Sequence, residues 1–150
     1  MMVVRTYIPY AIRVVMEDVW EHIKDDGPEQ FIDWEPRLDD NSRWYVGYLD
    51  NELAGVFWMR RVNTRTWEAH ANVRPQFWGD RQGTKLCREA IAVMIDDTGA
   101  KKTIALIPDS SPATQRMAEA IGFRREGVQT QSFIKDGQVY DQVHYGITRK

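Results

Sequence analysis

The chain has 150 residues, a formal net charge of −2, 43% hydrophobic residues and 28% charged residues. These values are typical of one globular domain over residues 1–150, and they exclude a disordered chain, a collagen and a coiled-coil rod. No apolar run approaches the roughly 20 residues that cross a bilayer, and the first residues lack the order of a signal peptide, so we expect no membrane partner. The single cysteine, Cys87, favours a reducing, cytoplasmic setting.

The first part of the chain predicts a strand followed by a helix. Residues 2–8 alternate weakly between apolar and polar, and Pro9 ends that strand. Apolar residues over 11–23 then recur at helical spacing, which indicates an amphipathic helix that closes before the Asp-Asp-Gly-Pro segment. We expect a second short helix over 29–34, before Pro36, and then a loop.

An antiparallel meander is expected next. Residues 43–49 and 53–62 alternate on either side of a tight turn, which predicts a β-hairpin. A third strand is predicted over 66–74, closed by Pro75. A loop rich in glycine and polar residues is predicted over 76–83.

The remaining elements alternate between helix and strand. A helix with one apolar face is expected from Thr84, with Gly99 as its C-terminal cap, and residues 102–107 form a short apolar strand. Ser111 precedes a proline, which is typical of a helix start. Two final strands flank an Asp-Gly turn within residues 128–148. The order predicts an α/β fold, with a mixed, mostly antiparallel central sheet flanked by helices.

Residues 73–84 combine a strand end, a glycine-containing loop and a helix start. Such a segment turns backbone N–H groups toward one point at the positive end of a helix dipole, where a pyrophosphate binds well. The glycine spacing is neither the dinucleotide fingerprint nor the phosphate loop that ends in Lys-Ser or Lys-Thr. An ordinary strand-to-helix turn therefore stays open as an alternative.

Three segments together carry a family resemblance. They are the hairpin of residues 45–55, the glycine loop of 73–84, and the segment 111–127, a helix to Ile121 followed by Gly-Phe and Glu-Gly pairs. In this order they resemble the GCN5-related N-acetyltransferase (GNAT) family over nearly the full chain. The resemblance implies a sheet whose central strand pair splays apart to admit acetyl-CoA. It also implies direct acetyl transfer to a primary amine, which is a protein N-terminus, a lysine or a small amine.

The resemblance also implies a set of cofactor-binding residues. The backbone of Val73 would polarise the thioester, and the loop would hold the pyrophosphate. Two loop positions depart from the family pattern, because Trp78 replaces the usual Arg or Gln and Arg81 replaces the usual glycine. Ser111 stands where the family usually has an Asn. The implied cofactor-binding residues are Val73, Trp78, Gly79, Asp80, Arg81, Gln82, Gly83, Thr84 and Ser111.

Acetyl transfer needs a base that makes the amine neutral. Glu68, His70 and Asn72 alternate along one strand and therefore share a face. We take Glu68 and His70 as the catalytic candidates, since imidazoles titrate near neutral pH and the family often places a catalytic Glu close to position 68. The alternative is that these side chains line a solvated face of the meander. No spacing of His, Cys or Asp suggests a metal site.

Charge is distributed unevenly along the chain. Residues 17–52 hold twelve Asp and Glu against three Lys and Arg, whereas residues 53–150 hold ten against fifteen. The acidic part is either a solvated helical face or a wall that attracts a basic acceptor amine. The mildly basic body gives no reason to expect a nucleic-acid partner. The oligomeric state stays open, with a homodimer as one option.

A second hypothesis is a catalytically inactive member of the family. The chain has six tryptophans, and several lie near loops where they would form a contact surface. Together with the altered loop, this resembles compact GNAT-fold proteins encoded by bacteriophages, including ones associated with virion head assembly. The fold would then serve as a binding or structural scaffold, in the host cytoplasm or the virion.

Overall fold

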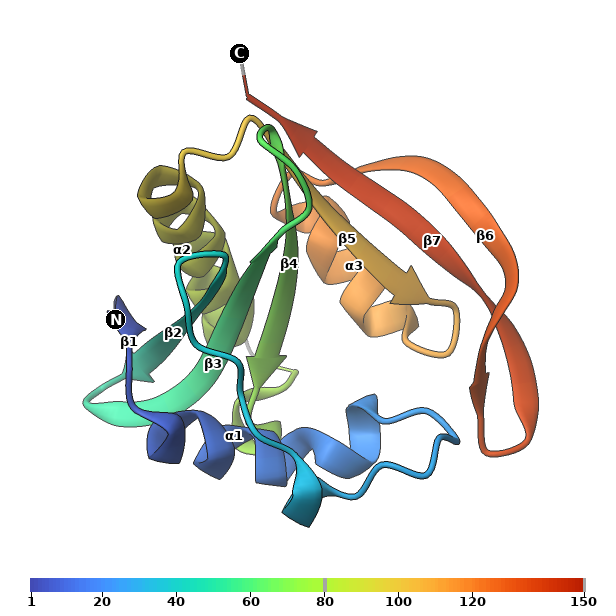
Figure 1. The fold of residues 1–150 in the computed structure, drawn as a ribbon, viewed down its shortest axis with the longest axis horizontal. Helices are drawn as coiled ribbons and strands as arrows, with labels where there is room; N and C mark the ends of the chain where they lie inside the picture. Colours follow the sequence, from blue (N-terminus) through green and yellow to red (C-terminus); the bar gives the residue numbers. More distant parts are fainter. Residues whose placement is uncertain (80, 150) are drawn as a thin grey trace.

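The computed structural model describes residues 1–79 and 81–149 and shows a seven-stranded sheet with helices on both faces (Figure 1). The strands are β1 (Met2–Thr6), β2 (Ser42–Leu49), β3 (Glu52–Arg61), β4 (Thr66–Val73), β5 (Lys102–Pro108), β6 (Arg124–Lys135) and β7 (Gln138–Thr148). The helices are α1 (Pro9–Ile23), α2 (Arg81–Thr98) and α3 (Pro112–Ala120). Two 3-10 turns cover Phe31–Asp33 and Pro75–Phe77. No helix among these described elements is both long enough and apolar enough to cross a membrane.

The sheet has the strand order β1-β2-β3-β4-β5-β7-β6. All neighbouring pairs are antiparallel except β4 and β5, which run parallel. Their ladder covers only Thr66–Glu68 against Lys102–Ile104, after which the two strands diverge (Figure 1). Beyond Glu68, β4 pairs with β3 alone. The predicted mixed, mostly antiparallel α/β fold is therefore confirmed, and the central strand pair splays as expected.

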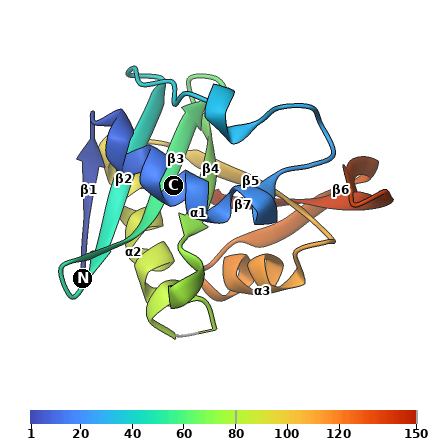
Figure 2. The same cartoon turned by 90° about the horizontal axis from the view of Figure 1, so that it is seen from below.

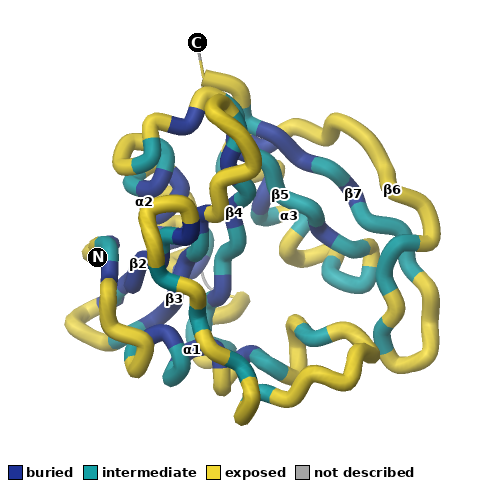
Figure 3. The backbone as a smooth tube through the Cα atoms, viewed as in Figure 1, coloured by how far each residue is buried: buried dark blue, intermediate teal, exposed yellow. Residues whose placement is uncertain are grey.

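Two hydrophobic clusters fix the helices to the sheet. On one face, α2 and α3 pack against β2, β3 and the β5–β7 pair, and on the other face α1 packs against β2 and β3 (Figure 2). Cys87 of α2 is fully buried in the first cluster, and burial raises the pKa of its thiol to about 12. Cys87 is therefore a core residue. The β6–β7 hairpin extends beyond both clusters and is mostly exposed along β6 (Figure 3).

The predicted short helix over 29–34 is wrong. The structure has only the 3-10 turn Phe31–Asp33 there. Prolines at 28 and 36 limit the segment to a few residues, and a helix that short cannot offset its nucleation cost. The rings of Phe31 and Trp34 instead pack against Trp20, with centroids 5.6 and 6.1 Å away. Tertiary contact rather than helix formation therefore shapes this segment.

Two other boundaries differ from the prediction. The helix expected from Thr84 already includes Arg81, so the end of the predicted loop is helical. The first strand of the last hairpin begins at Arg124 rather than near 128, and a bulge between Arg125 and Gly127 accommodates the glycine. Glycines and charges marked both segments as loops, but pairing with β7 and packing of the α2 start override that local preference.

Candidate active site

His70 and Glu68 form a pair on β4, on the sheet face that α1 covers. The His70 Nε2 atom lies 3.3 Å from Glu68 Oε1, and Glu68 also accepts a hydrogen bond from Arg60 on β3. These hydrogen bonds, from His70 first and then Arg60, hold the pKa of Glu68 at about 2 although burial opposes the shift. The Glu68 side chain is 15% exposed and that of His70 is 40% exposed. Glu68 is thus a fixed negative charge behind a more accessible imidazole.

His70 lines a cavity of about 370 Å³ between the sheet and the segment that follows α1. Asn72, two residues further along β4, lines it as well, whereas Glu68 does not. Side chains from α1, from the loop after it and from β2 and β3 complete the lining. The predicted shared face of β4 therefore borders a cavity at His70 and Asn72.

Tryptophan rings form most of the apolar lining. The Trp58 ring stacks on His70 at 4.8 Å between centroids, and Trp44 stacks on Trp58 at 5.4 Å. Trp34 contacts both Trp44 and Trp20, so an unbroken row of rings leads from α1 to His70. The periodicity of the sequence alone did not predict this row. In the register of the hairpins, Trp44 lies opposite Trp58 and Trp58 lies opposite His70, which places all three on one face.

Carboxylates line the rim of the same cavity. Asp25, Glu29 and Glu35 are among its lining residues, and Glu35 also pairs with Arg13 of α1 at 3.3 Å. These three residues belong to the acidic part of the chain, residues 17–52. Asp26 and Asp33, which belong to it as well, do not line the cavity.

The predicted pyrophosphate segment lies at the open end of the β4–β5 splay. Because β4 and β5 are parallel, α2 and α3 both begin at this end of the strand pair. Arg81 and Gln82 are exposed at the start of α2, Thr84 is half-buried, and Asp80 lies outside the described residues. The first turn of a helix offers backbone N–H groups without intrahelical partners.

The two glycines of this segment have different structural roles. Gly79 has φ +71°, a left-handed conformation that other residues rarely adopt, and open space surrounds its Cα. A Cβ on Gly83 would lie 2.9 Å from the carbonyl oxygen of Phe77. Gly83 therefore lets the backbone of the loop approach the start of α2. The close approach that requires this glycine is thus between two parts of the chain.

Trp78 bridges the end of β4 and the end of α1. Its indole Nε1 donates to the Val73 carbonyl at 2.6 Å, and its ring meets the edge of His22 at 4.7 Å. The side chain of Trp78 thus lies next to the Val73 backbone, where the resemblance implies the thioester. Near the start of α3, Ser111 takes the predicted N-cap position, but its hydroxyl makes no capping hydrogen bond. The neighbouring Ser110 hydroxyl is buried without a partner among the described residues.

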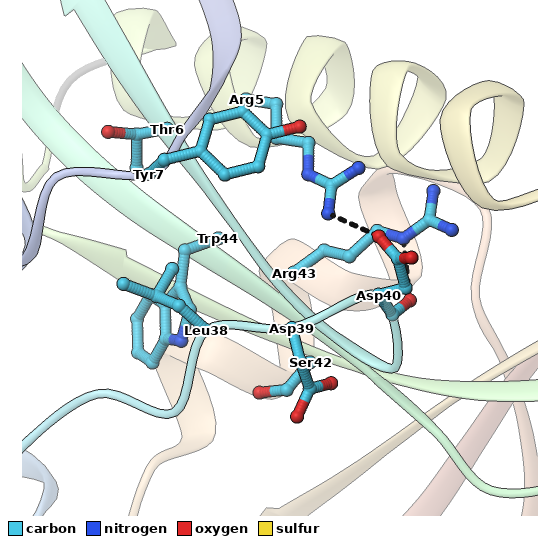
Figure 4. Close-up of a pocket in the computed structure, with 9 residues that line it drawn as sticks. All are labelled: Arg5, Thr6, Tyr7, Leu38, Asp39, Asp40, Ser42, Arg43 and Trp44. Atoms are coloured by element: carbon cyan, nitrogen blue, oxygen red, sulfur yellow. Dashed lines mark hydrogen bonds and ion pairs between the residues drawn. The ribbon is translucent and has the colours of Figure 1, made fainter.

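A second cavity of about 310 Å³ lies beside the end of β1 and contains none of the predicted site residues (Figure 4). Its charged groups are already paired: Arg5 bonds Asp40 at 3.4 Å, and Arg43 donates to the Asp40 backbone carbonyl at 2.8 Å. Asp97 of α2 lies 3.2 Å from Arg43 and 4.0 Å from Arg5. These ion pairs join β1, β2 and α2. The 370 Å³ cavity beside His70 is therefore the candidate site.

Comparisons with known proteins agree with this geometry. The model of the acetyltransferase (GNAT) family matches residues 10–123. A spermidine N-acetyltransferase chimera from Vibrio cholerae and hSSAT superposes with a TM-score of 0.80 at 17% identity, over 99% of this chain and 96% of that one. A ribosomal-protein-alanine N-acetyltransferase from Brucella melitensis gives 0.76 at 15% identity, over 99% of both chains.

A third structure was solved with acetyl-CoA bound. This GNAT family acetyltransferase from Elizabethkingia anophelis superposes with a TM-score of 0.69 at 16% identity, over 98% of this chain and 97% of that one. At these identities the likeness shows a common fold. None of the curated proteins matches the chain in sequence.

Proposed function

Because the chain belongs to the acetyltransferase (GNAT) family, we propose that it transfers the acetyl group of acetyl-CoA to a primary amine that carries further positive charge. One observation carries this proposal. His70, which lies 3.3 Å from Glu68, lines a cavity with aromatic walls and an acidic rim, next to the splay between β4 and β5. A base, a binding cavity for a cation and an open strand edge thus lie together.

The residues at the splay fit acetyl-CoA, which supplies a thioester-activated acetyl group. The edge of β4 that faces β5 is without a strand partner after Glu68, and such an edge can pair with the amides of a ligand. The backbone of Val73 lies at its end. Around the first turn of α2, Arg81 and Lys85 are exposed cations suited to phosphates. We assign Trp78, Gly79, Arg81, Gln82, Gly83, Thr84 and Ser111 to this binding region.

We assign the base to His70 and a positioning role to Glu68. A carboxylate whose pKa is about 2 binds a proton too weakly to take one from an ammonium group near neutral pH. Glu68 instead orients the imidazole through their 3.3 Å contact. His70 faces the cavity and accepts the proton of the amine, directly or through one water.

The acidic rim supports a cationic acceptor. Asp25, Glu29 and Glu35 lie around the cavity that His70 lines, and the tryptophan rings between them suit the apolar stem of an alkylamine. A spermidine N-acetyltransferase is among the structural neighbours, which is consistent with such an acceptor. Arg81, the departure that motivated the inactive alternative, is exposed at the start of α2 rather than packed inside the loop.

The test measures release of CoA thiol with acetyl-CoA and a set of monoamines and diamines. We expect turnover with a diamine, and a loss of about a hundredfold or more in H70Q, since general-base catalysis contributes roughly 10²–10⁴-fold. H144Q is the matched control, because His144 lies on β7 and does not line the cavity. No thiol release with any amine, or full activity in H70Q, would refute the proposal.

A further inference from the structure

One wall of the 370 Å³ cavity is a loop without an apolar core of its own. Lys24, Asp25, Gly27 and Glu29 of this loop line the cavity. Residues 25–30 are all exposed, and none of them belongs to either hydrophobic cluster. Phe31 and Trp34 pack against Trp20 after this loop, so the position of residues 25–30 themselves depends on polar contacts.

Those contacts come from the tip of the β6–β7 hairpin. The Asp26 carboxylate accepts the backbone N–H of Asp136 through Oδ1 at 2.8 Å and that of Gly137 through Oδ2 at 2.9 Å. The Asp26 N–H donates to the carbonyl of Ile134 at 3.1 Å. Asp136 and Gly137 are the central residues of the two-residue turn, so the hairpin ladder leaves their N–H groups unpaired. One carboxylate satisfies both.

A lysine of the same hairpin holds the end of α1. Lys135 Nζ donates to the carbonyls of Glu21 at 3.1 Å and Lys24 at 2.8 Å, which are among the last carbonyls of the helix. We call Asp26 and Lys135, with the hairpin backbone of residues 134–137, the hairpin clamp. The clamp joins the loop after α1 to the tip of the β6–β7 hairpin, at the lower right of Figure 1. Asp26 is 110 positions from Asp136 and 111 from Gly137 in the sequence.

The hydrogen bonds from Gly137 and Asp136 lower the pKa of the Asp26 carboxyl below its ordinary value of 3.8. Asp26 is therefore ionised at neutral pH, and both bonds are charge-assisted. The clamp acts on the wall opposite His70 and includes no residue of β4 or α2. Its effect is thus confined to the acceptor side of the candidate site.

We propose that Asp26 is a positioning residue for the acceptor amine: by fixing the loop to the hairpin tip, it holds Asp25 and Glu29 at a set distance from His70. This inference rests on the proposed acetyl transfer to a cationic amine. Asp26 itself does not line the cavity and touches no reacting group. Losing the clamp loosens the acidic wall, so the acceptor binds less well while acetyl-CoA binds as before.

The test compares D26A and D26N with wild type in steady-state kinetics. We expect D26A to raise KM for diaminohexane about tenfold to a hundredfold, as for the loss of one or two charge-assisted hydrogen bonds. KM for acetyl-CoA and kcat stay within about twofold. D26N keeps one acceptor oxygen and gives an intermediate KM. D136N is the matched control, since it removes the same charge at the hairpin tip without removing a clamp bond.

Hydrogen exchange supplies a readout that is independent of activity. In D26A the amides of residues 136 and 137 exchange faster, because they lose the Asp26 carboxylate as acceptor. The amide of residue 26 exchanges faster as well, because its hydrogen bond to the Ile134 carbonyl opens more often once the loop is released. K135M removes the two hydrogen bonds that Lys135 donates to the end of α1, which belong to the same clamp. The double variant D26A/K135M is therefore no worse in acceptor KM than the worse single variant.

The outcomes separate this inference from the proposed function. A wild-type protein that releases no CoA thiol with any amine refutes the proposed function, and calorimetric binding of diaminohexane then replaces KM as the readout. Equal acceptor KM, or equal binding, in D26A and D136N overturns the positioning role. So does a D26A variant whose KM for acetyl-CoA rises as much as its KM for the amine.

Discussion

At the scale of single residues, the candidate base is defined by what surrounds it. His70 has a carboxylate at 3.3 Å on one side and the Trp58 ring at 4.8 Å on another. The carboxylate fixes the orientation of the imidazole, and the ring restricts its rotation. A buried charge of this kind is costly without partners, and Glu68 has two of them, His70 and Arg60. The pair is therefore a coupled unit, and changing either residue affects the other.

E68Q tests this coupling through pH. The pKa of Glu68 is about 2 in the folded chain against an ordinary 4.5, so its ionised form stabilises the fold above pH 4.5 and this contribution is lost as the pH falls toward 2. E68Q is expected to cost about 1.5–3 kcal/mol near neutral pH, as for hydrogen bonds to charged groups, and progressively less in acid. Urea unfolding at a series of pH values measures this, with the exposed Glu52 as control in E52Q. A difference that does not change with pH would contradict the assignment.

The same variant separates positioning from proton transfer. E68Q keeps the imidazole and loses the carboxylate that orients it. We expect kcat to fall, but by less than in H70Q. An unchanged kcat in E68Q would show that Glu68 acts only in folding.

At the scale of elements, the start of α2 depends on a close approach between two backbone segments. Replacing Gly83 by Ala places a Cβ 2.9 Å from the Phe77 carbonyl. We expect G83A to lose about 1–3 kcal/mol, as for overpacking, and to weaken acetyl-CoA binding because the loop is displaced. Thermal unfolding and calorimetry measure the two effects, with E89A, at an exposed position of the same helix, as control. A more stable G83A, as in an unhindered helix, would contradict this account.

Periodicity and turn chemistry in the sequence were sufficient to predict most elements. The apolar face of α1, the Asp-Gly hairpin and the cap at Gly99 depend on neighbouring residues, and all three are present. The register of β2 against β3 could not be predicted from neighbouring residues, because a bulge between Gly47 and Tyr48 shifts it by one residue. Without that bulge Trp44 would lie opposite Phe57 and Trp58 would face the other side of the sheet, so the ring row could not be predicted from alternation alone.

The candidate site could be predicted only where its residues share one element. Glu68 and His70 lie on one strand, and alternation was enough to place them on a common face. The acidic wall was predicted as a region, but the division between Asp25, which lines the cavity, and Asp26, which bonds the hairpin, was not. That division depends on a contact with residues 110 positions away, for which the local sequence carries no signal.

At the scale of the whole molecule, charge is arranged around the site in two regions. The acidic side chains of the cavity rim lie on the α1 face, and the exposed Arg81 and Lys85 lie at the start of α2. The two regions suit two ligands of opposite charge that approach the same strand pair. The acidic and basic parts of the sequence therefore contribute to two separate regions around the site.

Ionic strength is the direct test of this arrangement. Raising the salt concentration from about 0.01 M to about 0.15 M shortens the screening length from about 30 Å to about 8 Å. KM for a diamine is expected to rise several-fold, and KM for the corresponding monoamine less. The triple variant D25N/E29Q/E35Q loses the difference, whereas D33N, whose carboxylate does not line the cavity, keeps it. Equal salt dependence for both amines would contradict the role of the rim.

The stacking of Trp58 on His70 has an optical consequence. A protonated imidazole quenches the emission of an indole in contact with it, and here the two rings are 4.8 Å apart with 28° between their planes. Trp44 stacks on Trp58 at 5.4 Å, so Trp58 lies between a second indole and the imidazole. His22 contacts Trp78 at 4.7 Å and would quench that indole in the same way. The intrinsic fluorescence of an H22Q variant therefore reports the charge on the candidate base without any substrate or label.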